Sequence, residues 1–108
     1  MLLLAFVATL SSCDKCDAEN PRAKLINQSS TVASVQIKTS DGNTENLNNV
    51  PAGSASDFRS YAAGKVTFTV TVDKADYKKD VHMSECYEYI ITVDANYNIT
   101  ATSIDRND

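Results

Sequence analysis

The fold class can be predicted from residues 66–72, which read Val66-Thr67-Phe68-Thr69-Val70-Thr71-Val72. Valine or phenylalanine occupies every second position, and threonine occupies the positions between them. A period of two is that of a β-strand with one face on a hydrophobic core and the other in water. We therefore expect a strand in the interior of its sheet that buries Phe68 and Val70.

The sequence on either side of this strand divides into further short strands separated by turns. Strands are expected over residues 22–27, 32–39, 45–50, 56–61, 66–73, 81–93 and 98–104. Turn signals separate them, Asp41-Gly42 being a strong hairpin turn, and residues 73–80 are interpreted as a charged connection. About seven short strands predict an all-β fold, a single antiparallel β-sandwich of the immunoglobulin or transthyretin kind. An open barrel is the alternative.

The composition limits both the number of domains and the kinds of partner. A chain of 108 residues is long enough for one hydrophobic core and too short for two. The net charge is -4, and lysine and arginine are scattered along the chain. Because phosphate backbones are bound by clustered positive charge, no nucleic acid partner is expected.

The N-terminus has the pattern of an export signal. Residues 2–10 form an almost unbroken apolar run, which is shorter than the roughly 20 residues of a membrane-spanning helix. The run ends in Leu10-Ser11-Ser12-Cys13, which resembles the lipobox of bacterial lipoproteins, in which the cysteine is lipidated and becomes the mature N-terminus. Because Met1 is followed directly by an apolar residue, we expect translation to begin upstream. The alternative is that the run is a buried strand or helix of the domain.

The lipobox resemblance divides the chain into three segments. They are a signal peptide of the lipoprotein type (residues 1–12), a lipid-anchored tether (13–21) and the β-sandwich domain (22–108). The lipid on Cys13 makes a membrane the expected partner. We expect a cell-envelope protein, an outer membrane lipoprotein, with the periplasmic and surface sides both open.

Three cysteines are present, and lipidation of Cys13 would leave Cys16 and Cys86. In an oxidising compartment these two can pair. The bridge would close a loop of about 70 residues and contribute on the order of 4 kcal/mol. The alternative is two free thiols, with Cys86 buried. The spacing of Cys13 and Cys16 also matches the C-x-x-C motif, so a thiol-redox function that uses Cys16 and Cys86 is the alternative to a structural disulfide.

Several motifs resemble a family of bacterial envelope proteins known as domain of unknown function 4397. They are Leu25-Ile26-Asn27-Gln28-Ser29-Ser30, Val35-Gln36-Ile37 with Asp41-Gly42, the stretch of residues 50–58, and Gly64 before the strand at 66–72. The resemblance covers residues 23–72, about half of the chain. Its motifs are turn glycines and core positions, so the resemblance implies a fold and an envelope location and transfers no functional residue.

No pattern of catalytic or metal-binding residues is found in the sequence. His82 is the only histidine, so no His-based triad or two-His zinc site can form within one chain. Among the five tyrosines, Tyr97 lies at the tip of an expected hairpin and is the expected exposed contact. We expect no enzyme activity, no cofactor and no metal, and a non-enzymatic binding or structural module for an unknown protein or glycan.

Overall fold

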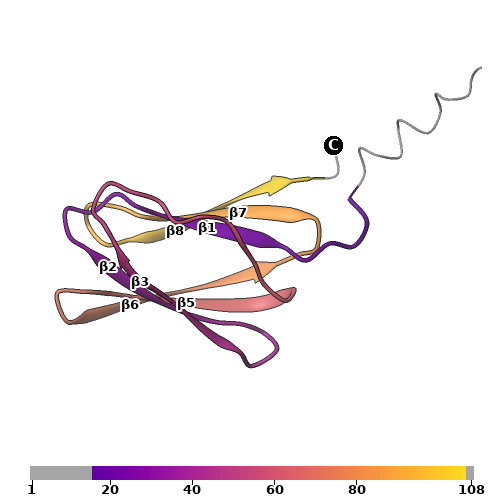
Figure 1. The fold of residues 1–108 in the computed structure, drawn as a ribbon, viewed down its shortest axis with the longest axis horizontal. Helices are drawn as coiled ribbons and strands as arrows, with labels where there is room; N and C mark the ends of the chain where they lie inside the picture. Colours follow the sequence, from indigo (N-terminus) through magenta and orange to yellow (C-terminus); the bar gives the residue numbers. More distant parts are fainter. Residues whose placement is uncertain (1–15, 107–108) are drawn as a thin grey trace, which may run out of the picture.

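The computed structural model describes residues 16–106, which form eight strands in two four-stranded sheets packed face to face (Figure 1). One sheet has the order β4-β1-β7-β8, and the other has the order β3-β2-β5-β6. The strands are β1 (Arg22–Asn27), β2 (Ala33–Lys38), β3 (Thr44–Val50), β4 (Arg59–Ser60), β5 (Gly64–Val72), β6 (Ala75–Met83), β7 (Tyr87–Val93) and β8 (Ile99–Asp105). Within residues 16–106 no helix is long and apolar enough to cross a membrane. The expected all-β sandwich is confirmed.

Strand β5 lies in the interior of its sheet, between β2 and β6, as the alternation of residues 66–72 predicts. Phe68 is 1% exposed, and Val70 is fully buried. The opposite sheet covers them with the inward side chains of β1 and β7, chiefly Leu25, Tyr89, Ile91 and Val93. The core therefore lies between the two sheets, with the inward side chains of β5 on one side and those of β1 and β7 on the other.

Strand β6 corrects the expected charged connection over residues 73–80 and raises the strand count from seven to eight. Val72 pairs with Ala75, so only Asp73 and Lys74 form the turn, and both have positive φ angles. Two positive φ angles are typical of a type I′ hairpin turn, for which a lysine at the second position is an unusual residue. On the inward side of β6, Lys79 lies opposite Phe68. Because a charged residue stands at a position where an apolar one is expected, the alternation of apolar and polar residues is interrupted and the strand is not predicted.

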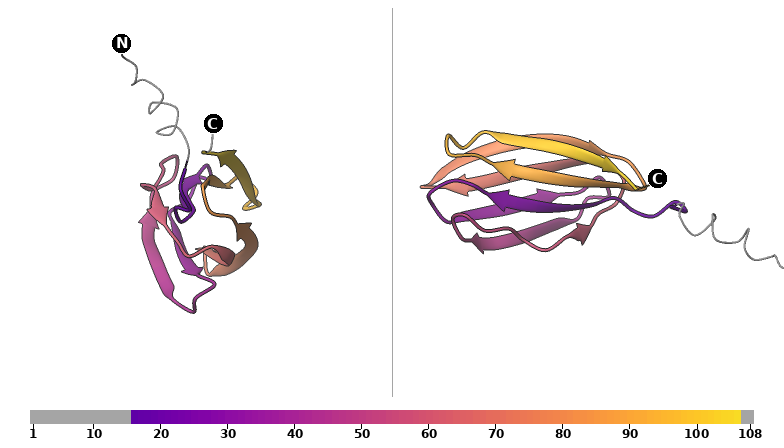
Figure 2. Two further views of the ribbon diagram at one scale, coloured as in Figure 1. Left: turned by 90° about the vertical axis from the view of Figure 1, so that its right-hand side faces the viewer. Right: turned by 90° about the horizontal axis from the view of Figure 1, so that it is seen from above.

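The sandwich is also not fully antiparallel, because β1 pairs with β7 in parallel over its whole length. Both strands start at the end of the sandwich where the tether enters (Figures 1 and 2). Turn signals identify neighbours that are joined by a hairpin, and these are antiparallel. A parallel pair is joined by a long connection, so its partners cannot be identified from the turns.

Candidate functional site

Cys16 and Cys86 form a disulfide, with their Cα atoms 5.6 Å apart. Of the two alternatives that the cysteine count leaves open, the structure therefore has the bridge. Cys86 is 5% exposed and lies in the connection between β6 and β7. The bridge attaches the segment before β1 to the end of the sandwich from which β1 and β7 start. The expected signal peptide, residues 1–12, and the expected lipidation site Cys13 lie outside the described residues.

Hydrogen bonds from a C-terminal arginine strengthen this attachment. The Arg106 guanidinium donates to Glu19 Oε1 at 3.1 Å and to the Asn20 carbonyl at 3.0 Å. The Cys86 amide donates to the Glu19 carbonyl, and the Arg106 amide donates to the Cys86 carbonyl, both at 2.9 Å. Residues 16–20 are therefore held against the ends of two strands. No sequence pattern points to Arg106, because its partners lie 86 and 87 positions away.

At the opposite end of the sandwich, the buried side chain of Asn27 joins three segments. Its Nδ2 donates to the carbonyls of Thr31 and Val50, and its Oδ1 accepts from the amide and the hydroxyl of Ser29. Its own backbone amide and carbonyl bond to Ser54 and Gly53. A buried polar side chain that is fully hydrogen-bonded fixes the path of the loops around it. Asn27, Ser29 and Gly53 belong to the motifs of the family resemblance, and here they have a structural role.

The glycine at position 64, which also belongs to those motifs, is required by the local structure. Its φ is 122°, and a Cβ at this position would lie 2.8 Å from the Cβ of Ser40. The Ser40 hydroxyl donates to the Ala63 carbonyl at 2.6 Å, so the hairpin at residues 40–43 lies directly against the start of β5. A side chain at position 64 would push these two segments apart.

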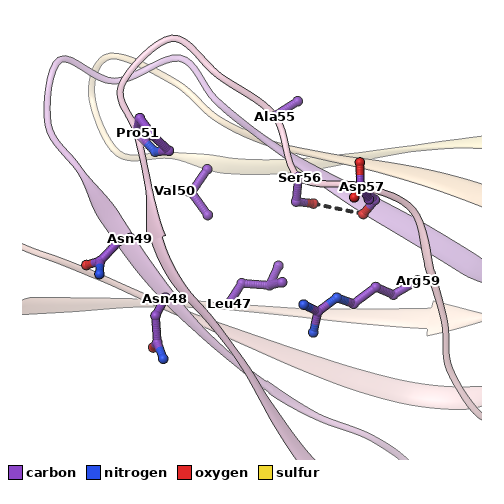
Figure 3. Close-up of a pocket in the computed structure, with 9 residues that line it drawn as sticks. All are labelled: Leu47, Asn48, Asn49, Val50, Pro51, Ala55, Ser56, Asp57 and Arg59. Atoms are coloured by element: carbon purple, nitrogen blue, oxygen red, sulfur yellow. Dashed lines mark hydrogen bonds between the residues drawn. The ribbon is translucent and has the colours of Figure 1, made fainter.

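A groove opens between β3 and residues 55–59, and it is the candidate binding site (Figure 3). Its volume is about 330 Å³. Leu47 and Val50, both nearly buried, contribute apolar surface. The polar lining includes Asn48, Asp57 and Arg59, and Figure 3 shows the Arg59 side chain reaching towards Leu47. The groove lining is mainly polar, and its exposed amide and guanidinium groups can hydrogen-bond to a polar ligand.

The polar groups of the groove differ in whether they are free to contact a ligand. The Ser56 hydroxyl accepts from the Leu25 amide and donates to the Asp57 carbonyl, so it holds the backbone and is not activated by a base. No histidine or cysteine is among the lining residues. Arg59 lies 3.8 Å from Glu45, and both side chains are more than one third exposed. An exposed pair of this kind is weak, so the Arg59 guanidinium can also bind an anionic or polar group of a ligand.

The structure corrects the expectation for Tyr97. Its side chain is half-buried and packs against the core rather than projecting from the hairpin tip. The ring centroid lies 5.4 Å from that of Tyr77 on β6, and the hydroxyl is 3.5 Å from Thr31 Oγ1. Aromatic pairs at this separation attract one another. Tyr97 therefore closes one end of the core and is not a free contact residue.

His82 and two acidic residues of β6 are exposed at the surface. His82 is exposed on the outer face of β6. Asp76 and Asp80 accept hydrogen bonds from Thr71 and Thr67 across the β5–β6 pair. Within residues 16–106 no group of three or more histidine, cysteine, aspartate or glutamate side chains could hold a metal ion.

Among residues 16–106, Tyr61 is the one residue whose pKa is moved far from its usual value. Burial raises the pKa of its hydroxyl from 10.0 to about 12, and the negative charge of Glu45 adds to the effect while Arg59 opposes it. The folded state therefore favours the neutral phenol. Its contribution to stability is present below pH 10 and is lost as the pH rises to about 12. The tyrosine is thus a neutral core residue at physiological pH.

Comparison with known proteins supports the fold alone. No family model matches the chain, and no curated protein matches it. A similar solved structure is the NMR structure of a protein from Eubacterium rectale, with 19% sequence identity and a TM-score of 0.50. The similarity covers 81% of this chain and 90% of that chain. At this identity the likeness extends to the sandwich architecture and not to a function.

Proposed function

We propose that this protein is a lipid-anchored module of the cell envelope that binds a protein or a glycan and is not an enzyme. The observation that carries the envelope location is the disulfide between Cys16 and Cys86. Structural disulfides persist in oxidising compartments, such as the bacterial periplasm and the cell surface, and are rare in the cytosol. A chain with such a bridge and an N-terminal apolar run has the features of an exported protein.

The position of the bridge fits an anchor at Cys13. Only Asp14 and Lys15 separate Cys13 from Cys16. Three residue steps of extended chain span at most about 11 Å, so a lipid on Cys13 would hold the disulfide end of the domain close to the membrane surface. The bridge and the hydrogen bonds of Arg106 hold the segment after Cys13 against the folded domain, so that little free chain would separate the lipid from the domain.

We expect Cys13→Ser to move the protein from the membrane fraction to the soluble fraction. The substitution removes the thiol that would carry the acyl chains, and each buried methylene of such a chain contributes about 0.8 kcal/mol to membrane binding. Cell fractionation followed by immunoblotting measures the change. Gln36→Ser, which introduces the same side chain at an exposed position outside the lipobox, is the matched control. Membrane association that is unchanged in Cys13→Ser would rule out the anchor.

The groove beside β3 is the proposed binding surface, because its mainly polar lining includes the exposed guanidinium of Arg59. The domain should be screened on arrays of envelope glycans and of extended peptides. We expect Arg59→Ala to reduce the signal of the best ligand at least tenfold, and Lys65→Ala, which removes an exposed cation outside the groove, to leave it unchanged. Equal signals from both variants would place binding elsewhere.

A thiol-redox function that uses Cys16 and Cys86 is the alternative. Exchange needs access of an attacking thiolate to a sulfur, and exposed disulfides are the ones that react readily. Cys16 is partly exposed, but attack on its sulfur would leave the Cys86 thiolate at a site that is 5% exposed, which favours a structural bridge. A redox protein would require this bridge to open in mild reductant while the domain stays folded.

A further inference from the structure

Each sheet has two edge strands, and three of the four edges carry features that hinder pairing with another chain. Strand β4 has only two residues. Strand β3 is bulged against β2, with Asn49 at a positive φ angle. Strand β6 places the charged and exposed Lys79 on its inward side, opposite Phe68. Short edges, bulges and inward charges are the usual means by which proteins prevent edge-to-edge association.

The fourth edge, strand β8, is neither short nor bulged, and its one inward charge, Asp105 opposite Tyr87, lies at the last position of the strand (Figure 2). It has seven residues, contains no lysine, arginine or proline, and pairs with β7 in an unbroken register. Every residue of β8 after Ile99 is exposed, including Ile104, which is 46% exposed. An exposed, regular strand rich in threonine and isoleucine is a template for another strand.

The hydrogen bonds at the two ends of the β7–β8 pair show which backbone groups face outward. Asp94 N donates to Asn98 O, and Arg106 N donates to Cys86 O, so both residue pairs bond directly across the ladder. Bonded and non-bonded pairs alternate along an antiparallel ladder. The backbone groups of Thr100, Thr102 and Ile104 are therefore directed to β7. Those of Ala101 and Ser103 are directed away from the sheet.

We propose that β8 pairs antiparallel with β8 of a second copy of this chain, about a two-fold axis at Thr102. In this register Ala101 of each copy lies opposite Ser103 of the other, and their outward N–H and C=O groups can bond. On the outer face Thr102 meets Thr102, and Thr100 meets Ile104. β-branched pairs of this kind stabilise adjacent strands, and no two like charges face each other. The exposed side chain of Ile104 would be covered.

The same symmetry is compatible with an anchor at each N-terminus. An axis normal to the sheet turns the outer faces of both β4-β1-β7-β8 sheets in the same direction. If the axis stands along the membrane normal, the two Cys16 residues lie at equal height above one membrane. The proposed pairing itself does not depend on the lipid, and it applies equally to a chain without one.

Cysteine cross-linking tests both the contact and its register. The full chain with Thr102→Cys is purified in detergent, treated with a mild oxidant and separated on a non-reducing gel. Because residue 102 faces itself across the axis at a Cα distance of about 4.5 Å, a strong dimer band is expected. Thr100→Cys faces Ile104 and should give a weak band, whereas Thr100→Cys combined with Ile104→Cys should restore a strong one.

The controls make each outcome decisive. The unmodified chain shows how much of any dimer band comes from Cys13. Gln36→Cys places an exposed thiol on β2, an interior strand of the other sheet, and shows how much comes from random collision. A Thr102→Cys band no stronger than that of Gln36→Cys would overturn the proposal, as would equal bands from Thr100→Cys and Thr102→Cys. If Thr102→Cys formed a mixed disulfide with a different protein, the partner of β8 would not be a second copy of this chain.

Light scattering provides a measurement without cross-links. The mass of the purified chain should approach twice that of one copy as its concentration rises to about 1 mM, because a single strand edge is a small interface that binds weakly. Thr102→Lys places two like charges together on the axis and should weaken association at least tenfold. Gln36→Lys should leave it unchanged. A mass that stays at one copy throughout would overturn the pairing.

Discussion

Replacing Phe68 with alanine is expected to lower the free energy of unfolding by roughly 3–5 kcal/mol. The side chain is 1% exposed on an interior strand and is the largest fully buried side chain of the described core. Its loss removes buried apolar surface and leaves a cavity that the two sheets cannot close, because their spacing is fixed by the surrounding core. Urea denaturation followed by circular dichroism measures the change.

Thr69→Ala, one position along the same strand, is the matched control for Phe68→Ala. Thr69 faces away from the core and is only half-buried, so we expect a loss below about 1 kcal/mol. The two variants change neighbouring residues of one strand and differ in which face they alter. A loss below about 1 kcal/mol for Phe68→Ala as well would contradict the packing of the core.

Replacing both Cys16 and Cys86 with alanine is expected to lower the free energy of unfolding by about 4 kcal/mol. The bridge spans 70 positions of the sequence, and a loop of this length loses much conformational freedom in the unfolded chain when it is closed. The double variant avoids the single free thiol that either substitution alone would leave. Urea denaturation of the oxidised protein and of the double variant gives the difference.

Alkylation and intact mass analysis show independently whether the bridge is structural. In the folded, unreduced protein neither Cys16 nor Cys86 should react with the alkylating reagent, and both should react after reduction in denaturant. Mild reductant without denaturant should leave them unreacted, because Cys86 is buried. Two reactive thiols in the folded protein would contradict the bridge, and opening in mild reductant would favour the redox alternative.

The sequence predicted most of the strands, because the period of two is a local property. Strands β1, β2, β3, β5 and β8 lie within two residues of their expected bounds. The expected fourth strand, residues 56–61, is reduced to the two residues of β4. Its neighbours at positions 55 and 56 bond to β1 only at isolated points, so this segment borders the groove instead of extending the sheet.

Strand β6 shows where a local pattern fails. An edge strand has water on one face and along its free side, so it tolerates charge at positions that an interior strand would keep apolar. Lys79 interrupts the inward row formed by Tyr77, Val81 and Met83. The row is recognisable once β5 is placed beside it, since Phe68 and Val70 define which side is inward.

The sequence by itself determined the all-β class, the single core around Phe68, and the set of thiols that could pair. These follow from alternation, length and cysteine count, all of which are local or compositional. Tertiary structure alone decided the parallel pairing of β1 with β7, the bond between Cys16 and Cys86, and the half-buried position of Tyr97. It also decided which strands form the edges, and so which backbone groups of β8 face outward. These features join residues far apart in the chain, and their energies depend on packing between strands that no sequence window contains.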